Sequence, residues 1–198
     1  MKNIYLAFVP WILFGAISQH DSVAAAALVA LAAAIAIGVP SFAAGRPKIL
    51  DLGAIAAFTL FAVAGLALGS DVEWLSQYAR AIAAGALGLI ALGSLLATPF
   101  TEQYARETVP REYWDSPRFK AVNRELTQMW GLVFFAMVPS HIVAGLIDTH
   151  RANTIFNWVV PVVLIVWAAK RTEAVTAAAD EPADREQPVT TPQNRSHA

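Results

Sequence analysis

The sequence predicts an all-α membrane protein, a polytopic bundle of about six transmembrane helices, and three observations predict it. The 198 residues are 57% hydrophobic and only 15% charged, whereas soluble domains are typically ~45–50% apolar and ~25% charged. Several stretches carry no charge at all, and each is about as long as the roughly 20 apolar residues that a helix needs to cross a bilayer. The basic residues, finally, fall almost entirely on alternate loops.

Six apolar runs divide the predicted membrane domain, residues 1–171. They cover residues 4–18, 23–39, 52–69, 81–97, 126–147 and 154–169. The second run is expected to end at Pro40 and the fourth before Pro99, because proline cannot continue a regular helix. Residues 172–198 are rich in Ala, Pro, Thr, Glu and Gln with almost no large apolar residue, which predicts a disordered cytoplasmic tail.

The first run has an alternative interpretation as a signal peptide, because Ala16-Ile17-Ser18 fits a small-x-small cleavage site. Lys2 is the only basic residue before the run, and Pro10 interrupts it, so the sequence favours a retained span. Cleavage would leave five helices with unchanged sidedness of the loops.

The basic residues predict that both termini are cytoplasmic. With the N-terminus inside, the inner segments carry ten of the 14 basic residues and the tail carries two more, while the outer segments hold only Arg80 and Arg151. This asymmetry is what the positive-inside rule describes. It predicts a multi-pass membrane protein with the N-terminus and the C-terminus in the cytoplasm.

The polar stretch Thr101–Glu125, between the fourth and fifth spans, is expected to lie against the inner leaflet. Its aromatic side chains suit the headgroup level, and Pro110 and Pro117 are expected to break it into short interfacial helices. Five basic residues accompany five acidic ones. This balance favours internal ion pairing or a protein-binding surface over a polybasic lipid-binding patch, and the alternative is a loop that braces the two neighbouring spans.

Small residues line several of the predicted helices. Gly65 and Gly69 have small-xxx-small spacing, and one face of the fourth span carries Ala81, Ala84, Gly85 and Gly88. Close van der Waals approach drives helix association in lipid, and small residues permit it. The pattern favours packing within the chain, with a homo-oligomer as the alternative.

The fifth span contains the one titratable residue that lies well inside an apolar run, His141, next to Pro139. Ionisable groups within a membrane often mark a transport path, so Pro139 and His141 are the candidate transport residues. The alternative is a histidine that only packs and hydrogen-bonds. No spacing supports haem ligation by a histidine pair, and we predict no cofactor and no metal site.

Other function classes find little support in the sequence. A net charge of −1 gives no basic surface for nucleic acid, and without cysteine there is no thiol nucleophile and no iron–sulfur cluster. No HExxH, GxSxG or Walker motif is present. The sequence therefore predicts a protein that is not an enzyme.

Three motifs resemble a known family. They are Gly45-Arg46-Pro47-Lys48, the stretch Asn123-Arg124-Glu125-Leu126-Thr127-Gln128-Met129-Trp130-Gly131-Leu132-Val133-Phe134-Phe135, and Thr154-Ile155-Phe156-Asn157-Trp158. Over roughly residues 46–170, their order is similar to that of the bacterial inner-membrane proteins called intracellular septation protein A (the YciB type) and their relatives.

The resemblance implies a non-enzymatic inner-membrane protein that acts in cell-envelope or division processes through other membrane or division proteins. The residues expected to make its contacts are Arg106, Trp114, Asn123, Thr127, Trp130 and Asn157. The alternative is a small solute or proton transporter or channel that uses the proline-broken fifth and sixth spans. A third hypothesis, a lipid- or quinone-handling membrane enzyme, is kept because apolar cavities between helices are invisible in a sequence.

Overall fold

A computed structural model describes residues 2–68 and 73–180, and it confirms the all-α class. Within these residues every regular element is helical. In chain order they are α1 (Lys2–Leu6), α2 (Val9–Ile17), α3 (Val23–Ala43), α4 (Ile49–Leu68), α5 (Glu73–Gly93), η1 (Ser94–Leu96), α6 (Phe100–Ala105), η2 (Arg111–Tyr113), α7 (Pro117–Ile147), α8 (His150–Thr154), the π-helical turn η3 (Ile155–Val159) and α9 (Val160–Asp180).

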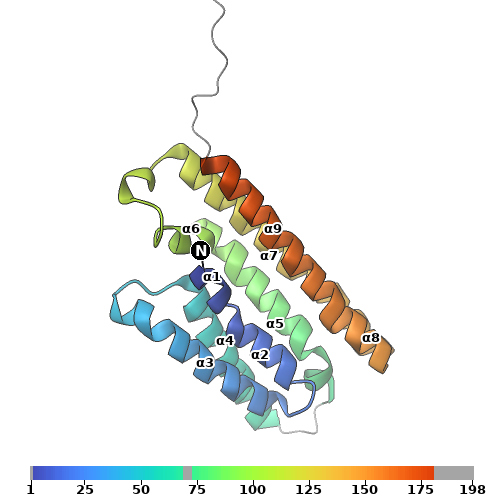
Figure 1. Ribbon diagram of the computed structural model, residues 1–198. Coiled ribbons are helices and arrows are strands. Elements are labelled where there is room, and N and C mark those ends of the chain that lie inside the picture. The colour runs from blue at the N-terminus through green and yellow to red at the C-terminus, as the bar shows by residue number, and fades with distance from the viewer. Residues whose placement is uncertain (1, 69–72, 181–198) are drawn as a thin grey trace, which may run out of the picture.

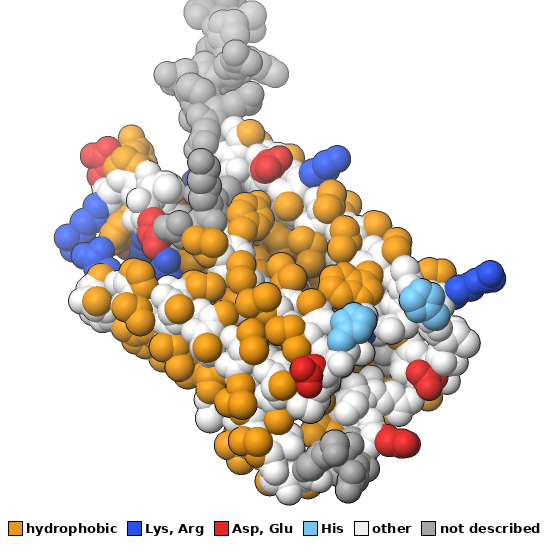
Figure 2. Space-filling model, turned by 60° about the horizontal axis from the view of Figure 1, so that its bottom comes forward, with side chains coloured by type: hydrophobic (Ala, Val, Ile, Leu, Met, Phe, Trp, Pro, Cys, Tyr) orange, Lys and Arg blue, Asp and Glu red, His pale blue; other side chains and the backbone are white. Residues whose placement is uncertain are grey.

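Five of the described helical stretches are long and apolar enough to cross a membrane, namely α3, α4, α5 with η1, α7, and the run from α8 to α9. The first apolar run is shorter and is broken between α1 and α2. Pro10 causes the break, because it has no N–H to offer the carbonyl of Leu6 and is tolerated at the first positions of a new helix. Hydrophobic side chains cover the middle of the face in Figure 2, as expected for a surface that meets lipid.

The long helices run side by side in one bundle (Figure 1), and the α6–η2 segment closes one end of it. The N-terminus and the end of α9 lie at this same end, which we call the basic end because Arg46, Lys48, Arg106 and Arg111 lie around it. α2 packs on α3, α3 on α4, α5 on α7, and α7 on α9. A tilted aromatic contact connects α2 to α4, with the ring centroids of Trp11 and Phe58 4.8 Å apart.

Several predicted boundaries are wrong, each for a local reason. α3 continues through Pro40 to Ala43, because a proline inside a membrane helix removes one N–H donor without forcing the helix to end. The residues from Pro117 to Glu125 are the start of α7 rather than a separate interfacial helix, since Ser116 caps them by accepting from the Phe119 N–H at 3.2 Å.

Two other helices extend further than the sequence predicts. α5 begins at Glu73 instead of Ala81, and α9 continues the last helix to Asp180, past the predicted start of the tail at Thr172. Residues 181–198, the rest of the predicted tail, lie outside the described residues.

The small-residue positions serve packing within the chain. A Cβ added at Gly65 of α4 would lie 2.8 Å from the backbone nitrogen of Ala24 in α3, and one at Gly88 of α5 would lie 2.9 Å from the Phe135 ring in α7. The prediction of intrachain packing is therefore confirmed for these two glycines, while Gly69 lies outside the described residues.

Gly65→Ala is expected to lower the melting temperature, because its methyl group would press against the α3 backbone. Gly93→Ala is the matched control, since a Cβ there meets nothing within 4 Å and alanine favours a helix by up to about 1 kcal/mol over glycine. Thermal unfolding of both variants in detergent measures the contrast. Equal shifts of the two melting temperatures would contradict the close packing of α3 on α4.

Candidate functional site: a lateral cavity with a polar end

A cavity of about 360 Å³ lies between the α1–α2 segment, α5, α7 and the η3–α9 run, and we call it the lateral cavity. Its walls are mostly aromatic and aliphatic. The aromatic side chains are Tyr5, Phe8, Trp11, Phe14, Trp130, Phe134 and Trp158. The volume falls within the ~300–1,000 Å³ that is typical of ligand pockets.

α7 contributes one continuous face to the lateral cavity. Trp130, Phe134, Met137 and His141 all line it, at the spacing of three or four that places side chains on one side of a helix. From Trp130 to His141 this face is about 16 Å long at 1.5 Å per residue. The cavity therefore extends over roughly half of the ~30 Å hydrocarbon core of a bilayer.

The lateral cavity opens sideways between α2 and α9. Ile12 of α2 and Val162 of α9 both line it, and these side chains are 54% and 52% exposed, so the cavity is not closed off between these two helices. In Figure 1, α2 and α9 stand in front of α5 and α7. The opening therefore lies on the side of the bundle, between two helices, rather than at either of its ends.

Aromatic stacking fixes the floor of the cavity. Phe8, in the turn between α1 and α2, stacks on Trp130 with ring centroids 5.3 Å apart and meets Phe134 edge-on at 5.5 Å. The Trp130 indole N–H also donates to the Thr172 hydroxyl of α9 at 3.0 Å. These contacts connect the short first helix to α7 and α9 across the bundle.

One end of the lateral cavity is polar. The Arg80 guanidinium donates from Nη1 to Asn153 Oδ1 at 3.2 Å, and Asn157 Nδ2 donates to the same oxygen at 2.5 Å. Asn157 Oδ1 lies 2.6 Å from His141 Nδ1. Because that oxygen can only accept, His141 carries its proton on Nδ1 in this arrangement. We call these four residues the polar end.

The break in the last helix places Asn157 in this chain of hydrogen bonds. Pro161 has no N–H for the carbonyl of Asn157, and the backbone takes a π-helical turn from Ile155 to Val159. π-Helical turns frequently occur at functional sites. The Ser140 hydroxyl donates to the Phe156 carbonyl at 2.6 Å, which holds this turn against α7.

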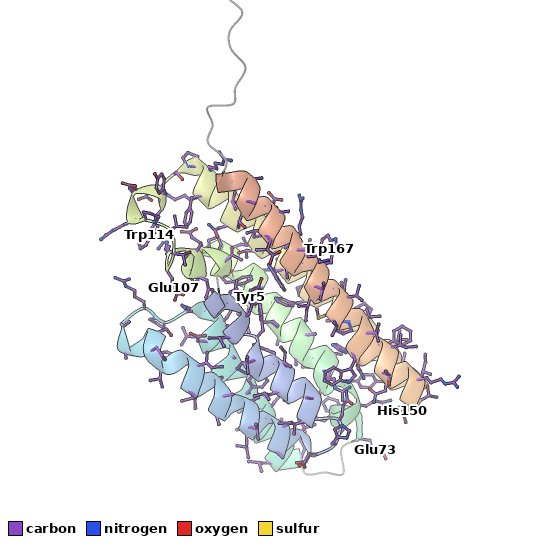
Figure 3. The ribbon with its side chains drawn as sticks, in the orientation of Figure 1. Tyr5, Glu73, Glu107, Trp114, His150 and Trp167 are labelled. Atoms are coloured by element: carbon purple, nitrogen blue, oxygen red, sulfur yellow. The ribbon has the colours of Figure 1, made fainter. Side chains whose placement is uncertain are left out.

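A second, larger cavity of about 1090 Å³ lies at the basic end, between the α3–α4 turn and the α6–η2 segment. Arg46, Lys48, Arg106 and Arg111 line it together with Asp51 and Glu107. Lys48 pairs with Glu107, and Arg106 Nη2 lies 2.5 Å from the buried carboxylate of Glu102. Figure 3 shows Glu107 and Trp114 at this end, opposite Glu73 and His150.

The α6–η2 segment is held firmly to the bundle, and its charges pair as the sequence suggested. The Thr101 hydroxyl donates to the Asn123 carbonyl at 2.7 Å and lies 2.8 Å from the Thr127 hydroxyl. The Trp114 ring lies beneath the guanidinium groups of Arg106 and Arg111, at 5.0 and 5.9 Å. Asp115 and Lys120 are exposed, and the Lys120 ammonium lowers the pKa of Asp115 through a 2.9 Å hydrogen bond.

The structure places the residues that the sequence singled out in three groups, with Pro139 apart from all of them. Trp130, His141 and Asn157 line the lateral cavity, while Pro139 lies on α7 with an exposed side chain. Asn123 and Thr127 are buried and hydrogen-bond to α6 or within α7. Arg106 and Trp114 line the cavity at the basic end.

Two site residues, Arg80 and Gly15, are not among the candidates that the sequence patterns indicate. Arg80 counted only as an outer loop charge, although it is the one basic residue between Lys48 and Arg106 in the sequence. A single basic residue in such a long apolar region is a sequence feature that could have indicated a functional role for Arg80. Gly15 lies inside an apolar run, and no sequence pattern distinguishes it from its neighbours. Only the fold shows that its carbonyl accepts a hydrogen bond from Arg80 Nε at 3.1 Å.

The tyrosine of α6 gives a pH-dependent prediction. Burial, together with the nearby carboxylate of Asp51, raises the pKa of Tyr104 well above its usual value near 10. The unfolded chain releases this proton above about pH 10 and the folded chain does not. The contribution of Tyr104 to the free energy of unfolding is therefore fully present below that pH. Above it, the free energy of unfolding falls by about 1.4 kcal/mol per pH unit for this one group.

Tyr104→Phe should remove this dependence, so alkaline unfolding followed by circular dichroism should begin at higher pH in the variant. The lost hydrogen bond to Asp51 is long, at 3.4 Å, so little stability is lost at neutral pH. Coincident alkaline unfolding curves would show that Tyr104 does not titrate as described.

The fold and the cavity together define the class: a protein of membrane-type apolar helices with a mostly apolar cavity that opens on the side of the bundle and ends in a polar group of side chains. Comparison with known proteins finds no matching family model, no matching curated protein and no matching solved structure. The function therefore has to be argued from the geometry of this chain.

Proposed function

We propose that this protein is a non-enzymatic membrane protein that binds a membrane amphiphile, with the apolar chain in the lateral cavity and the polar group at the polar end. The observation that carries the proposal is the sideways opening of an apolar cavity between α2 and α9. An apolar cavity does not hold water, and an empty one forgoes van der Waals contacts with its lining. A hydrocarbon chain from the adjoining bilayer is the available occupant.

The membrane in this proposal is the bacterial inner membrane, with the basic end in the cytoplasm. The segregation of lysine and arginine supports this orientation, and Figure 2 shows a cluster of basic side chains at the left edge of the molecule, with separate basic side chains at the top and at the right. The polar end of the lateral cavity then lies toward the outer side. A role in cell-envelope or division processes, as the septation resemblance implies, stays part of the proposal, with the amphiphile as a component of that envelope.

A filled cavity tests the proposal. A Cβ added at Gly15 meets nothing within 4 Å, so Gly15→Leu should place its side chain in the lateral cavity without displacing the backbone. Native mass spectrometry after extensive detergent washing should find about one lipid retained per wild-type chain and none on Gly15→Leu. Gly93→Leu is the matched control, because its Cβ also meets open space but lies away from the cavity.

Two results would overturn the proposal. The first is a wild-type protein that retains no lipid under conditions in which it stays folded. The second is equal retention by wild type and Gly15→Leu, because the lipid would then lie elsewhere on the molecule.

A second candidate function is the docking of a partner protein at the basic end. Arg111 favours it, since its side chain is exposed, lies over the Trp114 ring and lines the cavity at the basic end. Arg111→Glu should abolish rescue of cell length and septum placement in a depleted host, while the variant still inserts. Normal rescue would exclude this surface. A solute or proton path is less well supported, because the cavity between His141 and the basic end is lined by aromatic rings.

A further inference from the structure

We infer that the amphiphile of the lateral cavity is anionic, with a phosphate headgroup, and that Arg80 binds this phosphate. The inference rests on the proposed function and adds the chemical class of the ligand. It starts from the one cationic side chain in the lining of the cavity.

Arg80 has only neutral partners among the described residues. Its Nε donates to the Gly15 carbonyl at 3.1 Å, and Nη1 donates to the Asn153 amide oxygen at 3.2 Å. None of the ion pairs found in this part of the chain includes Arg80, and its Nη2 donates to no described group.

A partly buried cation beside an apolar cavity is costly unless an anion compensates it, and such residues in membrane proteins are usually paired or functional. The guanidinium is planar and fits the oxygens of a phosphate through paired N–H donors. The N–H groups of Arg80 Nη2 have no acceptor among the described residues and can donate to a phosphate oxygen. A neutral amphiphile, such as a diacylglycerol or a quinone, would leave this charge uncompensated.

The polar end holds Arg80 in position for this contact. Arg80 is tied to α2 through Gly15 and to the last helix through Asn153, while the bond from Asn157 to His141 extends the same chain to α7. All the helices that surround the cavity therefore fix the orientation of the guanidinium. A preorganised donor loses little entropy when the ligand binds.

The depth of Arg80 suits a lipid headgroup. It follows Glu73, the first residue of α5, by seven positions, which places it roughly 10 Å inside the helix end. The aromatic part of the cavity continues from there toward the basic end. A lipid with its phosphate at Arg80 would thus extend an acyl chain along Trp130 and Phe134, as a lipid of the outer leaflet does.

A competition between lipids of equal chain length tests the inference. The protein is placed in phosphatidylcholine nanodiscs that contain equal small amounts of phosphatidylglycerol and diacylglycerol, then extracted and washed, and the retained lipids are identified by native mass spectrometry. Wild type should retain phosphatidylglycerol over diacylglycerol by about tenfold, the effect of one charge-assisted contact. Arg80→Gln should retain both equally, and Arg80→Lys should keep most of the preference.

Arg151→Gln is the matched control, because Arg151 is the other basic residue expected on the outer side, is exposed, and does not line the cavity. It should leave the tenfold preference unchanged. Retention of diacylglycerol by Arg80→Gln also shows that the cavity of that variant is intact.

Equal retention of the two lipids by wild type would overturn the phosphate inference and leave the lateral-cavity proposal standing. The same holds if Arg80→Gln keeps the preference. If wild type retains no lipid of any kind, both proposals fail, so the two failures are distinguishable.

Discussion

Trp130→Ala is expected to destabilise the protein by about 3 kcal/mol, near the lower end of the range for truncating a buried aromatic residue. Trp130 is 1% exposed, stacks on Phe8 and Phe134, and donates to Thr172. Its loss removes the contacts that connect the first helix, α7 and α9. The value lies near the lower end because an acyl chain can fill part of the space.

Two comparisons isolate the role of Trp130. Trp130→Phe keeps a ring for stacking and loses the hydrogen bond to Thr172, so it should cost about 1 kcal/mol. Trp167→Ala is the control on the opposite surface of α9, because its side chain is 55% exposed and points outward (Figure 3). Unfolding in mixed detergent measures all three variants. Equal losses for Trp130→Ala and Trp167→Ala would show that Trp130 does not connect the helices.

Arg106→Glu is expected to destabilise the protein by roughly 2 kcal/mol, below the 3–5 kcal/mol for breaking a fully buried ion pair, because the Arg106 side chain is 36% exposed. Glu102 is buried, with its carboxylate 2.5 Å from the guanidinium. The substitution would place a second carboxylate beside it on α6. The α6–η2 segment should therefore loosen from α7.

The charge-swapped double variant Glu102→Arg with Arg106→Glu should recover part of this loss, as an ion pair requires. Arg111→Glu should change stability by less than about 0.5 kcal/mol, because Arg111 is exposed. Thermal unfolding measures the stability of these variants, and limited proteolysis measures how easily the α6–η2 segment loosens from α7 in each of them. An Arg106→Glu variant as stable as Arg111→Glu would contradict the role of the pair. Arg111→Glu is consequently the cleaner variant for testing partner docking, since it separates function from folding.

The features that depend on composition were predictable from the sequence. A run of apolar residues in lipid has to be helical, because no water is present to satisfy the backbone. Ion pairing in the α6–η2 segment followed from neighbouring opposite charges such as Glu102 and Arg106. Packing at Gly65 followed from its small size.

Helix ends and the lateral cavity were not predictable in the same way. Pro40 was expected to end α3, but the helix continues to Ala43. The cavity depends on where a broken first helix lies relative to α9, and this is set by stacking between Phe8 and Trp130, residues far apart in the sequence. Phe8, Trp11 and Phe14 did carry a signal, because a spacing of three places them on one face of a helix.

A crystal structure of the wild-type protein grown from a lipid mesophase tests the central claim most directly. We expect continuous electron density for one acyl chain between α2 and α9, alongside Trp130, with its headgroup against Arg80. The contrary result is α2 packed directly on α9 with no cavity between them, which would remove the basis for amphiphile binding.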